Sequence, residues 1–158
     1  MRTRLKKHLV VATLIALFAV SAAIAAARVA VTVKVAHNAT LNTSILVDQS
    51  GRTLYHITTD TGKKVTCTGA CATIWPPLTV PKGTKAAAGS GVVKSKLGTI
   101  IRPDGRTQVT YAGLTLYRYS GDSKPGQAKG EGFQKIWYVS NAAGKLVKKA
   151  VSSGGYGR

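Results

Sequence analysis

The hydrophobic and polar positions of this chain follow a β pattern along most of its length. Short runs of alternating or β-branched residues are separated by turn signals such as Pro-Asp-Gly at 103–105 and Ala-Gly at 112–113. Turns of this kind join neighbouring antiparallel strands, so the sheet should be mainly antiparallel. The predicted strands cover residues 29–35, 44–48, 53–58, 98–102, 107–111, 114–119, 136–140 and 145–151.

This strand pattern predicts an all-β fold. We expect two related antiparallel halves that form one compact sandwich or partly closed barrel, preceded by an N-terminal signal helix. Residues 70–75 could form one short helical turn before Pro76 and Pro77 end it. The predicted organisation is one β-domain at 28–151, made of repeats at about 41–80 and 97–144 with a linker at 81–96, followed by a disordered tail at 152–158.

The N-terminus has the organisation of a secretory signal peptide at residues 1–27. A basic segment precedes the apolar run 9–20, and the small residues 21–27 offer A-x-A cleavage sites. An uncleaved anchor is the alternative, because residues 9–27 carry no charge and approach the ~20 apolar residues of a spanning helix. The chain is therefore expected to be secreted or attached to the cell envelope.

The body of the chain contains one sequence unit twice. The segment 51–60, Gly-Arg-Thr-Leu-Tyr-His-Ile-Thr-Thr-Asp, returns at 113–122 as Gly-Leu-Thr-Leu-Tyr-Arg-Tyr-Ser-Gly-Asp, at a constant offset of 62. The same offset relates Val47 to Val109 and Trp75 to Trp137. Each copy therefore consists of a turn glycine, a strand, an aspartate suited to a turn and, 15 positions later, a tryptophan.

These residues resemble a bacterial secreted-repeat family whose members are predicted lipoproteins with the motif Y-x-[FWY]-x-x-D. The resemblance rests on the two Leu-Tyr segments, on the string C-T-G-A-C-A-T-I-W-P-P at 67–77, and on the glycine loop before Trp137. It implies export and tandem repeats, whereas the biochemical function of the family is not established. The repeat-motif residues that it marks are Tyr55, Asp60, Trp75, Tyr117, Tyr119, Asp122 and Trp137.

The chain departs from the family pattern at three places. Ile57 occupies an aromatic position, so only the second copy, from Tyr117 to Asp122, fits the motif in full. The lipidation cysteine is absent, which favours release or anchoring by the apolar N-terminal segment. Lysines stand in the glycine loop 122–132, where a calcium site would need six to eight oxygen ligands.

The charge of the chain is strongly positive. It carries 23 basic and 5 acidic residues, and without the four basic residues of the signal the balance is 19 − 5 = +14. Such a protein is attracted to anionic components of the cell envelope or to envelope proteins. The basic residues are scattered, so no nucleic-acid partner is expected, and a membrane is expected only through an uncleaved N-terminal segment.

The two cysteines allow two interpretations. In an exported protein, Cys67 and Cys71 are expected to form a disulfide that fixes the loop before Trp75. The alternative is a pair of thiolates that binds copper or takes part in electron transfer, with His56 as the third ligand. Against this alternative, His56 lies on the opposite strand face from Tyr55, and a histidine in a strand is more often a half-exposed structural residue.

No catalytic pattern is found in the sequence. The five carboxylates lie near turns without a paired motif, and neither His37 nor His56 has a neighbouring carboxylate in sequence. We therefore expect a non-catalytic binding or structural module with an unknown ligand and no cofactor. The aromatic repeat-motif residues could form a binding platform, but a core role is favoured, with tyrosine hydroxyls bonded near Asp60 or Asp122.

Overall fold

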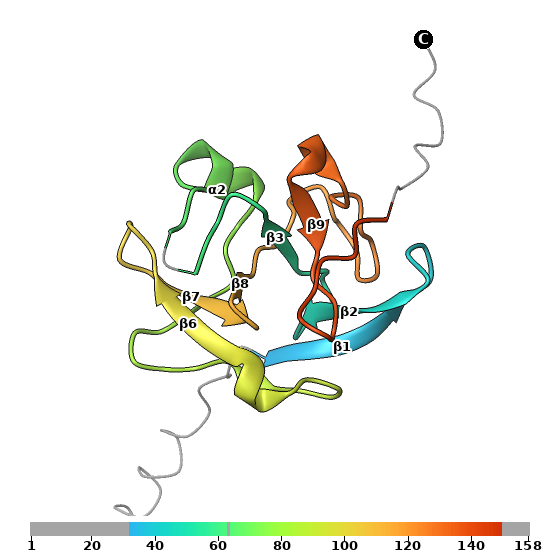
Figure 1. Ribbon diagram of the computed structural model, residues 1–158, viewed down its shortest axis with the longest axis horizontal. Helices are drawn as coiled ribbons and strands as arrows, with labels where there is room; N and C mark the ends of the chain where they lie inside the picture. Colours follow the sequence, from blue (N-terminus) through green and yellow to red (C-terminus); the bar gives the residue numbers. More distant parts are fainter. Residues whose placement is uncertain (1–31, 63, 150–158) are drawn as a thin grey trace, which may run out of the picture.

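The computed structural model describes residues 32–62 and 64–149 (Figure 1). The predicted signal or anchor at 1–27 and the predicted tail at 152–158 lie outside these residues. The elements are the strands β1 (Thr32–Asn38), β2 (Thr43–Asp48), β3 (Tyr55–Ile57), β4 (Thr79–Val80), β5 (Ala87–Ala88), β6 (Leu97–Ile101), β7 (Thr107–Tyr111), β8 (Leu114–Thr115) and β9 (Trp137–Val139), the helix α2 (Ala70–Ile74), and the 3-10 turns η2 (Lys94–Lys96) and η3 (Phe133–Lys135).

The strands form three small sheets. The first has the order β2-β1-β5, the second pairs β3 with β9, and the third has the order β4-β7-β6 with β8 also paired to β7. All pairs are antiparallel except β1 with β5. The all-β prediction is confirmed, and within the described residues no sheet closes into a barrel.

Two predicted strands are much shorter than expected. The segment 114–119 is a strand only at β8, and beyond it Tyr117 makes single bridges to Tyr55 and Pro77. The part of 145–151 that the structure describes contains only the bridge from Leu146 to Ser140.

The two repeats are interlocked, because each pairs with the other. The amide of Thr58 donates to the carbonyl of Ile136 at 2.9 Å, and 62 residues away Ser120 donates to Ile74 at 2.9 Å. At the centre, Tyr55 and Tyr117 exchange reciprocal backbone hydrogen bonds of 2.8 and 2.9 Å. The strand of each repeat therefore pairs with the tryptophan segment of the other.

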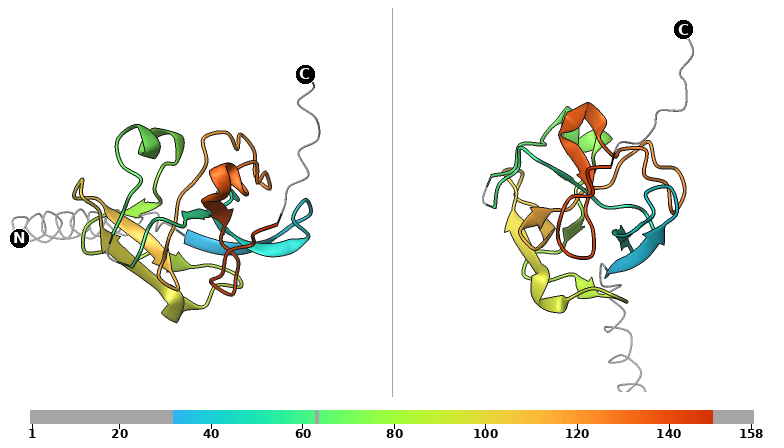
Figure 2. Two further views of the ribbon diagram at one scale, coloured as in Figure 1. Left: turned by 45° about the horizontal axis from the view of Figure 1, so that its top comes forward. Right: turned by 45° about the vertical axis from the view of Figure 1, so that its right-hand side comes forward.

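This arrangement is approximately two-fold symmetric. The β1–β2 and β6–β7 hairpins extend to either side, and the loops that carry α2 and η3 lie at the same end of the molecule (Figures 1 and 2).

The sequence offset of 62 does not match the structural equivalence at one of the predicted pairs, Val47 and Val109. Ser140 accepts from the amide of Leu46 and Leu78 accepts from that of Val109, so Leu46 and not Val47 is the counterpart of Val109. The turn of the first copy is one residue longer.

The core consists of two hydrophobic clusters. One contains the aromatic residues of both repeats, with Trp75 and Trp137 stacked at 3.9 Å between ring centroids and 4° between planes. The other is mainly aliphatic and consists of Val33, Leu46, Leu54, Leu78, Val80, Val109, Tyr111 and Leu116. Residues 81–96 contribute to the second cluster through Ala86 and Val92, so this connection between the repeats also packs against the core.

Candidate functional site

The repeat-motif tyrosines donate hydrogen bonds to the aspartate of the other repeat. The hydroxyl of Tyr55 donates to Asp122 Oδ2 at 2.5 Å, and that of Tyr117 donates to Asp60 Oδ2 at 2.6 Å. The predicted tyrosine–aspartate bonding is confirmed, with the partners exchanged between repeats. Burial raises the pKa of Tyr55, and it raises that of Tyr117 to about 12, so both hydroxyls keep their protons. These two tyrosine–aspartate hydrogen bonds therefore link the two copies, and each is called a brace below.

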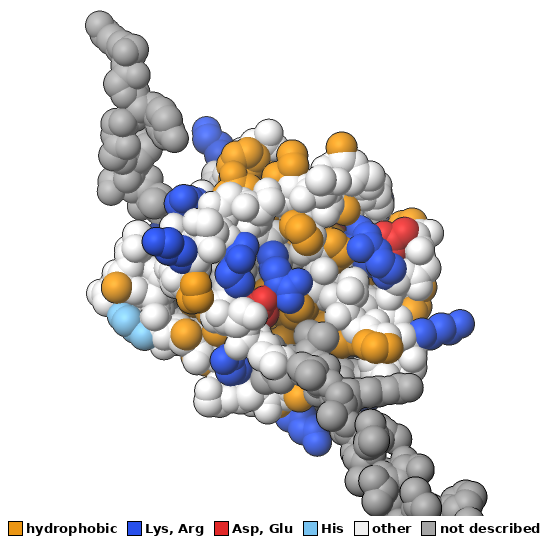
Figure 3. Space-filling view, turned by 180° about the vertical axis from the view of Figure 1, so that it is seen from behind, with side chains coloured by type: hydrophobic (Ala, Val, Ile, Leu, Met, Phe, Trp, Pro, Cys, Tyr) orange, Lys and Arg blue, Asp and Glu red, His pale blue; other side chains and the backbone are white. Residues whose placement is uncertain are grey.

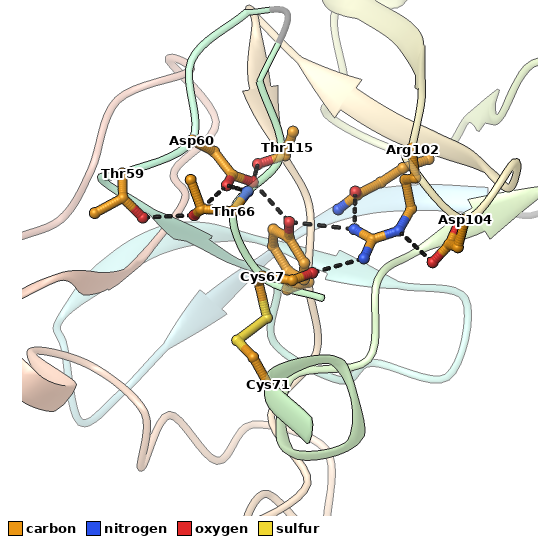
Figure 4. The surroundings of a disulfide bond; sticks show 10 residues. Thr59, Asp60, Thr66, Cys67, Cys71, Arg102, Asp104 and Thr115 are labelled. Atoms are coloured by element: carbon orange, nitrogen blue, oxygen red, sulfur yellow. Dashed lines mark hydrogen bonds and ion pairs between the residues drawn. A yellow bond between two sulfur atoms is a disulfide. The ribbon is translucent and has the colours of Figure 1, made fainter. Parts of the chain in front are cut away.

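Asp60 collects four hydrogen bonds. Its Oδ1 accepts from the amide and the hydroxyl of Thr66 at 2.7 and 2.8 Å, while Oδ2 also accepts from the Thr115 hydroxyl at 2.7 Å (Figure 4). A buried carboxylate is tolerated when its oxygens are satisfied in this way. Asp60 therefore fixes the segment that leads directly into Cys67.

Arg102 is buried beside this aspartate and was not singled out from the sequence. Its guanidinium donates to the carbonyl of Cys67 at 2.6 Å, to Gln108 Oε1 at 2.6 Å and to the hydroxyl of Tyr117 at 3.3 Å (Figure 4). Its Nε also donates to Asp104 at 3.2 Å. From the sequence, an arginine at the end of a strand is expected to face solvent, and no local pattern marks Arg102 as buried.

Cys67 and Cys71 form a disulfide, with an S–S distance of 2.01 Å and a Cα–Cα distance of 5.2 Å. The bond closes the loop that carries α2, immediately before Trp75 (Figure 4). Since the carbonyl of Cys67 is held by Arg102, this loop is fixed at its base both covalently and by a hydrogen bond. The disulfide prediction is confirmed.

His56 is buried at 5% exposure, so the expectation of a half-exposed residue is wrong. Its Nδ1 lies 3.0 Å from the Thr115 hydroxyl, which gives its own proton to Asp60, and 3.2 Å from the Thr115 carbonyl. Both partners accept, so Nδ1 carries the proton. Burial lowers the pKa of His56 and favours the neutral ring.

The copper alternative needs the reduced chain, because the two sulfur atoms are bonded to each other. Among residues 32–62 and 64–149, no three His, Cys, Asp or Glu side chains are grouped so that they could hold a metal ion. His56 is engaged by Thr115 on its Nδ1 side. Copper binding by Cys67, Cys71 and His56 therefore stays a prediction for the reduced protein.

Asp122 organises the glycine loop of the second repeat. Its Oδ1 accepts from the amide of Lys129 at 3.0 Å, and the next amide, that of Gly130, donates to the Tyr55 hydroxyl at 3.3 Å. A Cβ at Gly130 would lie 2.6 Å from the ring of Trp75, so only glycine fits there without displacement. The loop is thereby held against the aromatic cluster.

The other acidic residues are also used inside the protein. Asp48 accepts from the amides of Ser50 and Arg52 and from the Arg118 side chain. Glu131 accepts from the amides of Val139 and Lys149, and burial raises its pKa. Asp48, Asp60, Asp122 and Glu131 are all at most 5% exposed. Four of the five carboxylates are therefore removed from the surface.

The basic residues have the opposite distribution. Of the sixteen lysines and arginines in the described residues, only Arg102 is buried. The one exposed carboxylate, Asp104, is paired with Arg106 at 2.8 Å, and this partner holds the pKa of Asp104 well below its usual range. Lysine and arginine side chains are distributed over the face shown in Figure 3, with few acidic groups between them. At the surface of the described residues, basic side chains therefore far outnumber carboxylates.

The fold and the two tyrosine–aspartate braces define a tandem-repeat β-protein whose two copies interlock around one aromatic cluster. The chain belongs to the family described as a secreted repeat of unknown function, whose model matches residues 42–79 and 98–140. The protein is thus a secreted or envelope protein, as predicted. No curated protein and no solved structure matches the chain. None of the helices in the described part of the chain is long and apolar enough to span a membrane.

Proposed function

We propose that this secreted protein is a non-catalytic module that binds anionic components of the cell envelope through its cationic surface. One observation carries the proposal: the fold buries four of five carboxylates and leaves fifteen of sixteen described basic residues at least partly exposed. Each buried carboxylate is satisfied by donors from the chain itself. Among the exposed or partly exposed basic residues that the structure describes, only Arg106 and Arg118 are paired with an acid, so most of their positive charge is not neutralised locally.

The distribution of the cations favours an extended partner over a small ligand. Exposed lysines occur in both repeats and in the connection between them, for example Lys64, Lys94, Lys124 and Lys145. A polyanion can contact many such groups at once, and each contact adds a small, salt-sensitive attraction. Envelope polymers with phosphodiester backbones and anionic lipid surfaces have this character.

The carboxylate contacts also support a non-catalytic role. General acid–base chemistry needs a carboxyl or imidazole group that can reach a substrate. Asp60, Asp122 and Glu131 are buried and hydrogen-bonded within the fold, and His56 is buried against Thr115. These groups serve the structure, so binding is the activity proposed for the surface.

Binding to poly(glycerol phosphate) tests this proposal, with dextran as the uncharged polymer. Isothermal titration calorimetry in 50 and 500 mM NaCl should show binding to the phosphate polymer that weakens strongly at high salt, and no binding to dextran. A variant with Lys64, Lys94, Lys124 and Lys145 all changed to glutamine should bind more weakly. Affinity for poly(glycerol phosphate) that is absent, or that does not respond to salt, would contradict the proposal.

A further inference from the structure

A pocket of about 400 Å³ opens on the surface of the third sheet. The turn that follows β4 forms one wall, and side chains of β6 and β7 form the other. The register places these walls together, because Val80 pairs with Thr107 and Thr107 pairs with Ile101. The turn itself is closed by the amide of Thr84, which donates to the Pro81 carbonyl at 3.1 Å. The pocket is therefore supported on both sides by backbone hydrogen bonds.

Thr107 brings an unpartnered hydroxyl to this pocket. The residue is 5% exposed, and its Oγ1 has no hydrogen-bond partner within the described residues. A buried hydroxyl without a partner is costly, and in folded proteins such a group is usually satisfied by protein atoms or ordered water, so this one is free to bond a ligand. Thr107 lines the pocket, while its hydroxyl itself is buried, so the side chain must rotate about χ1 to present the hydroxyl to a ligand there.

Two lysines line the same pocket. Lys82 and Lys85 are exposed residues of its lining. Asp104, on the turn that joins β6 and β7, is already paired with Arg102 and Arg106, so it does not compensate them. Two cations and a hydroxyl donor around one small cavity match the oxygens of a phosphate group.

The remaining lining indicates what is attached to that phosphate. Ile101 is 60% exposed and lines the pocket together with Thr99. An isoleucine side chain gains by contact with carbon atoms and offers nothing to a bare phosphate ion. The combination therefore fits an ester, in which a short carbon chain follows the charged group.

We propose that this pocket binds a phosphate ester, with Lys82 and Lys85 contacting the phosphate oxygens and the Thr107 hydroxyl, once its side chain has rotated toward the pocket, donating to one of them. The inference deepens the proposed function, on which it rests, by assigning one specific phosphate site within a generally cationic surface. Phospholipid headgroups and phosphate-containing wall polymers share this chemistry and are the two sources that the experiment separates.

The test is an NMR titration of the full chain with sn-glycerol 3-phosphate, with glycerol as the uncharged control. Saturable shifts of the amides of Gly83, Thr84 and Thr107 are expected with the ester and not with glycerol. The double variant Lys82→Gln/Lys85→Gln should lower the affinity about tenfold, since each lost contact is a charged hydrogen bond. The matched double variant Lys145→Gln/Lys148→Gln removes the same charge elsewhere and should change the affinity less than about twofold.

Thr107→Val separates a ligand role from a structural one. Because the hydroxyl has no partner among the residues that the structure describes, valine should leave the melting temperature unchanged or slightly higher. The affinity for sn-glycerol 3-phosphate should nevertheless fall several-fold. A melting temperature that drops clearly, with unchanged affinity, would show that the hydroxyl serves the fold and would overturn the assignment.

The source of the phosphate follows from displacement of bound sn-glycerol 3-phosphate. Either poly(glycerol phosphate) or soluble dihexanoyl phosphatidylglycerol should displace it, and the one active at lower concentration identifies the source. Displacement by neither would overturn the site.

The two proposals can fail separately. If the two double variants weaken polymer binding equally and the pocket amides do not shift with the ester, the phosphate-ester site is refuted while the proposed function stands. If the polymer does not bind at all, the proposed function is refuted.

Discussion

The two tyrosine–aspartate braces have the same geometry and different surroundings. Asp60 accepts hydrogen bonds from the Tyr117 hydroxyl and from three further donors, and the buried Arg102 donates to the same tyrosine hydroxyl. Asp122 accepts hydrogen bonds from the Tyr55 hydroxyl and from one backbone amide, that of Lys129. One brace is therefore surrounded by side chains from several elements, whereas the other relies on the backbone of a glycine-rich loop.

This difference shows which parts of the repeat serve folding. The tyrosine, the aspartate and the tryptophan occupy equivalent places in both copies and are buried, so they hold the copies together. The disulfide, His56 and Arg102 occur on one side only and reinforce a single brace. The shared residues provide the frame, and chemistry directed outward must come from the exposed residues around it.

The largest effect is expected where the two copies meet. Trp75→Ala or Trp137→Ala should lower the free energy of unfolding by about 3–5 kcal/mol, because each ring is 2% exposed and stacks on the other. Thermal unfolding followed by circular dichroism measures this loss. Phe133→Ala, at a ring that is 39% exposed, serves as the control and should cost much less. Wild-type melting temperatures for both tryptophan variants would contradict the shared core.

The second prediction concerns the arginine that reinforces only the Asp60 brace. Arg102→Met should cost roughly 2–4 kcal/mol, since the Cys67 carbonyl and Gln108 lose buried donors. Arg106→Met removes an exposed arginine that shares the partner Asp104, and it should stay within about 0.5 kcal/mol of the wild type. Urea unfolding of both variants gives the comparison. Equal effects would mean that the buried contacts add nothing.

The third prediction addresses the disulfide, which only the first copy has. Closing so short a loop should stabilise the fold by about 2 kcal/mol, and Cys67→Ala/Cys71→Ala should lose this amount. Alkylation without reductant should leave the intact mass unchanged. Two alkylated thiols together with stoichiometric copper binding would instead support the metal site with His56.

The smallest effect concerns pH. Burial lowers the pKa of His56 below the ordinary 6.5, so the unfolded chain takes up this proton first as the pH falls. The stabilisation by neutral His56 is complete above pH 6.5 and is lost as the pH falls from there toward the folded pKa. His56→Asn should therefore show a smaller decrease in melting temperature between pH 7 and 5. His37→Asn, at an exposed position, should follow the wild type.

The fold class and the repeat could be predicted because they depend on local patterns. Alternation, turn residues and the recurring Leu-Tyr segments predicted most strands, and the spacing of Cys67 and Cys71 predicted the disulfide. The short strands β4 and β5 were not predicted, since two residues cannot show an alternation of hydrophobic and polar positions.

The partner exchange between repeats could not be predicted. Tyr55 is five residues from Asp60 and Tyr117 is five residues from Asp122, so the spacing is equally compatible with bonds within a copy. Long-range pairing decides the partner, as the reciprocal bonds of Tyr55 and Tyr117 show. The burial of the carboxylates was missed for a related reason, because a turn aspartate usually faces solvent.

A double-mutant cycle on the braces tests the interlocked arrangement most directly. Free energies of unfolding are measured for Tyr55→Phe and Asp122→Ala, singly and together, and the cycle is repeated for Tyr55→Phe with Asp60→Ala. The structure predicts a coupling energy of about 1 kcal/mol or more between Tyr55 and Asp122, and less than about 0.5 kcal/mol between Tyr55 and Asp60. Stronger coupling within a repeat than across the repeats would contradict the exchange on which the account rests.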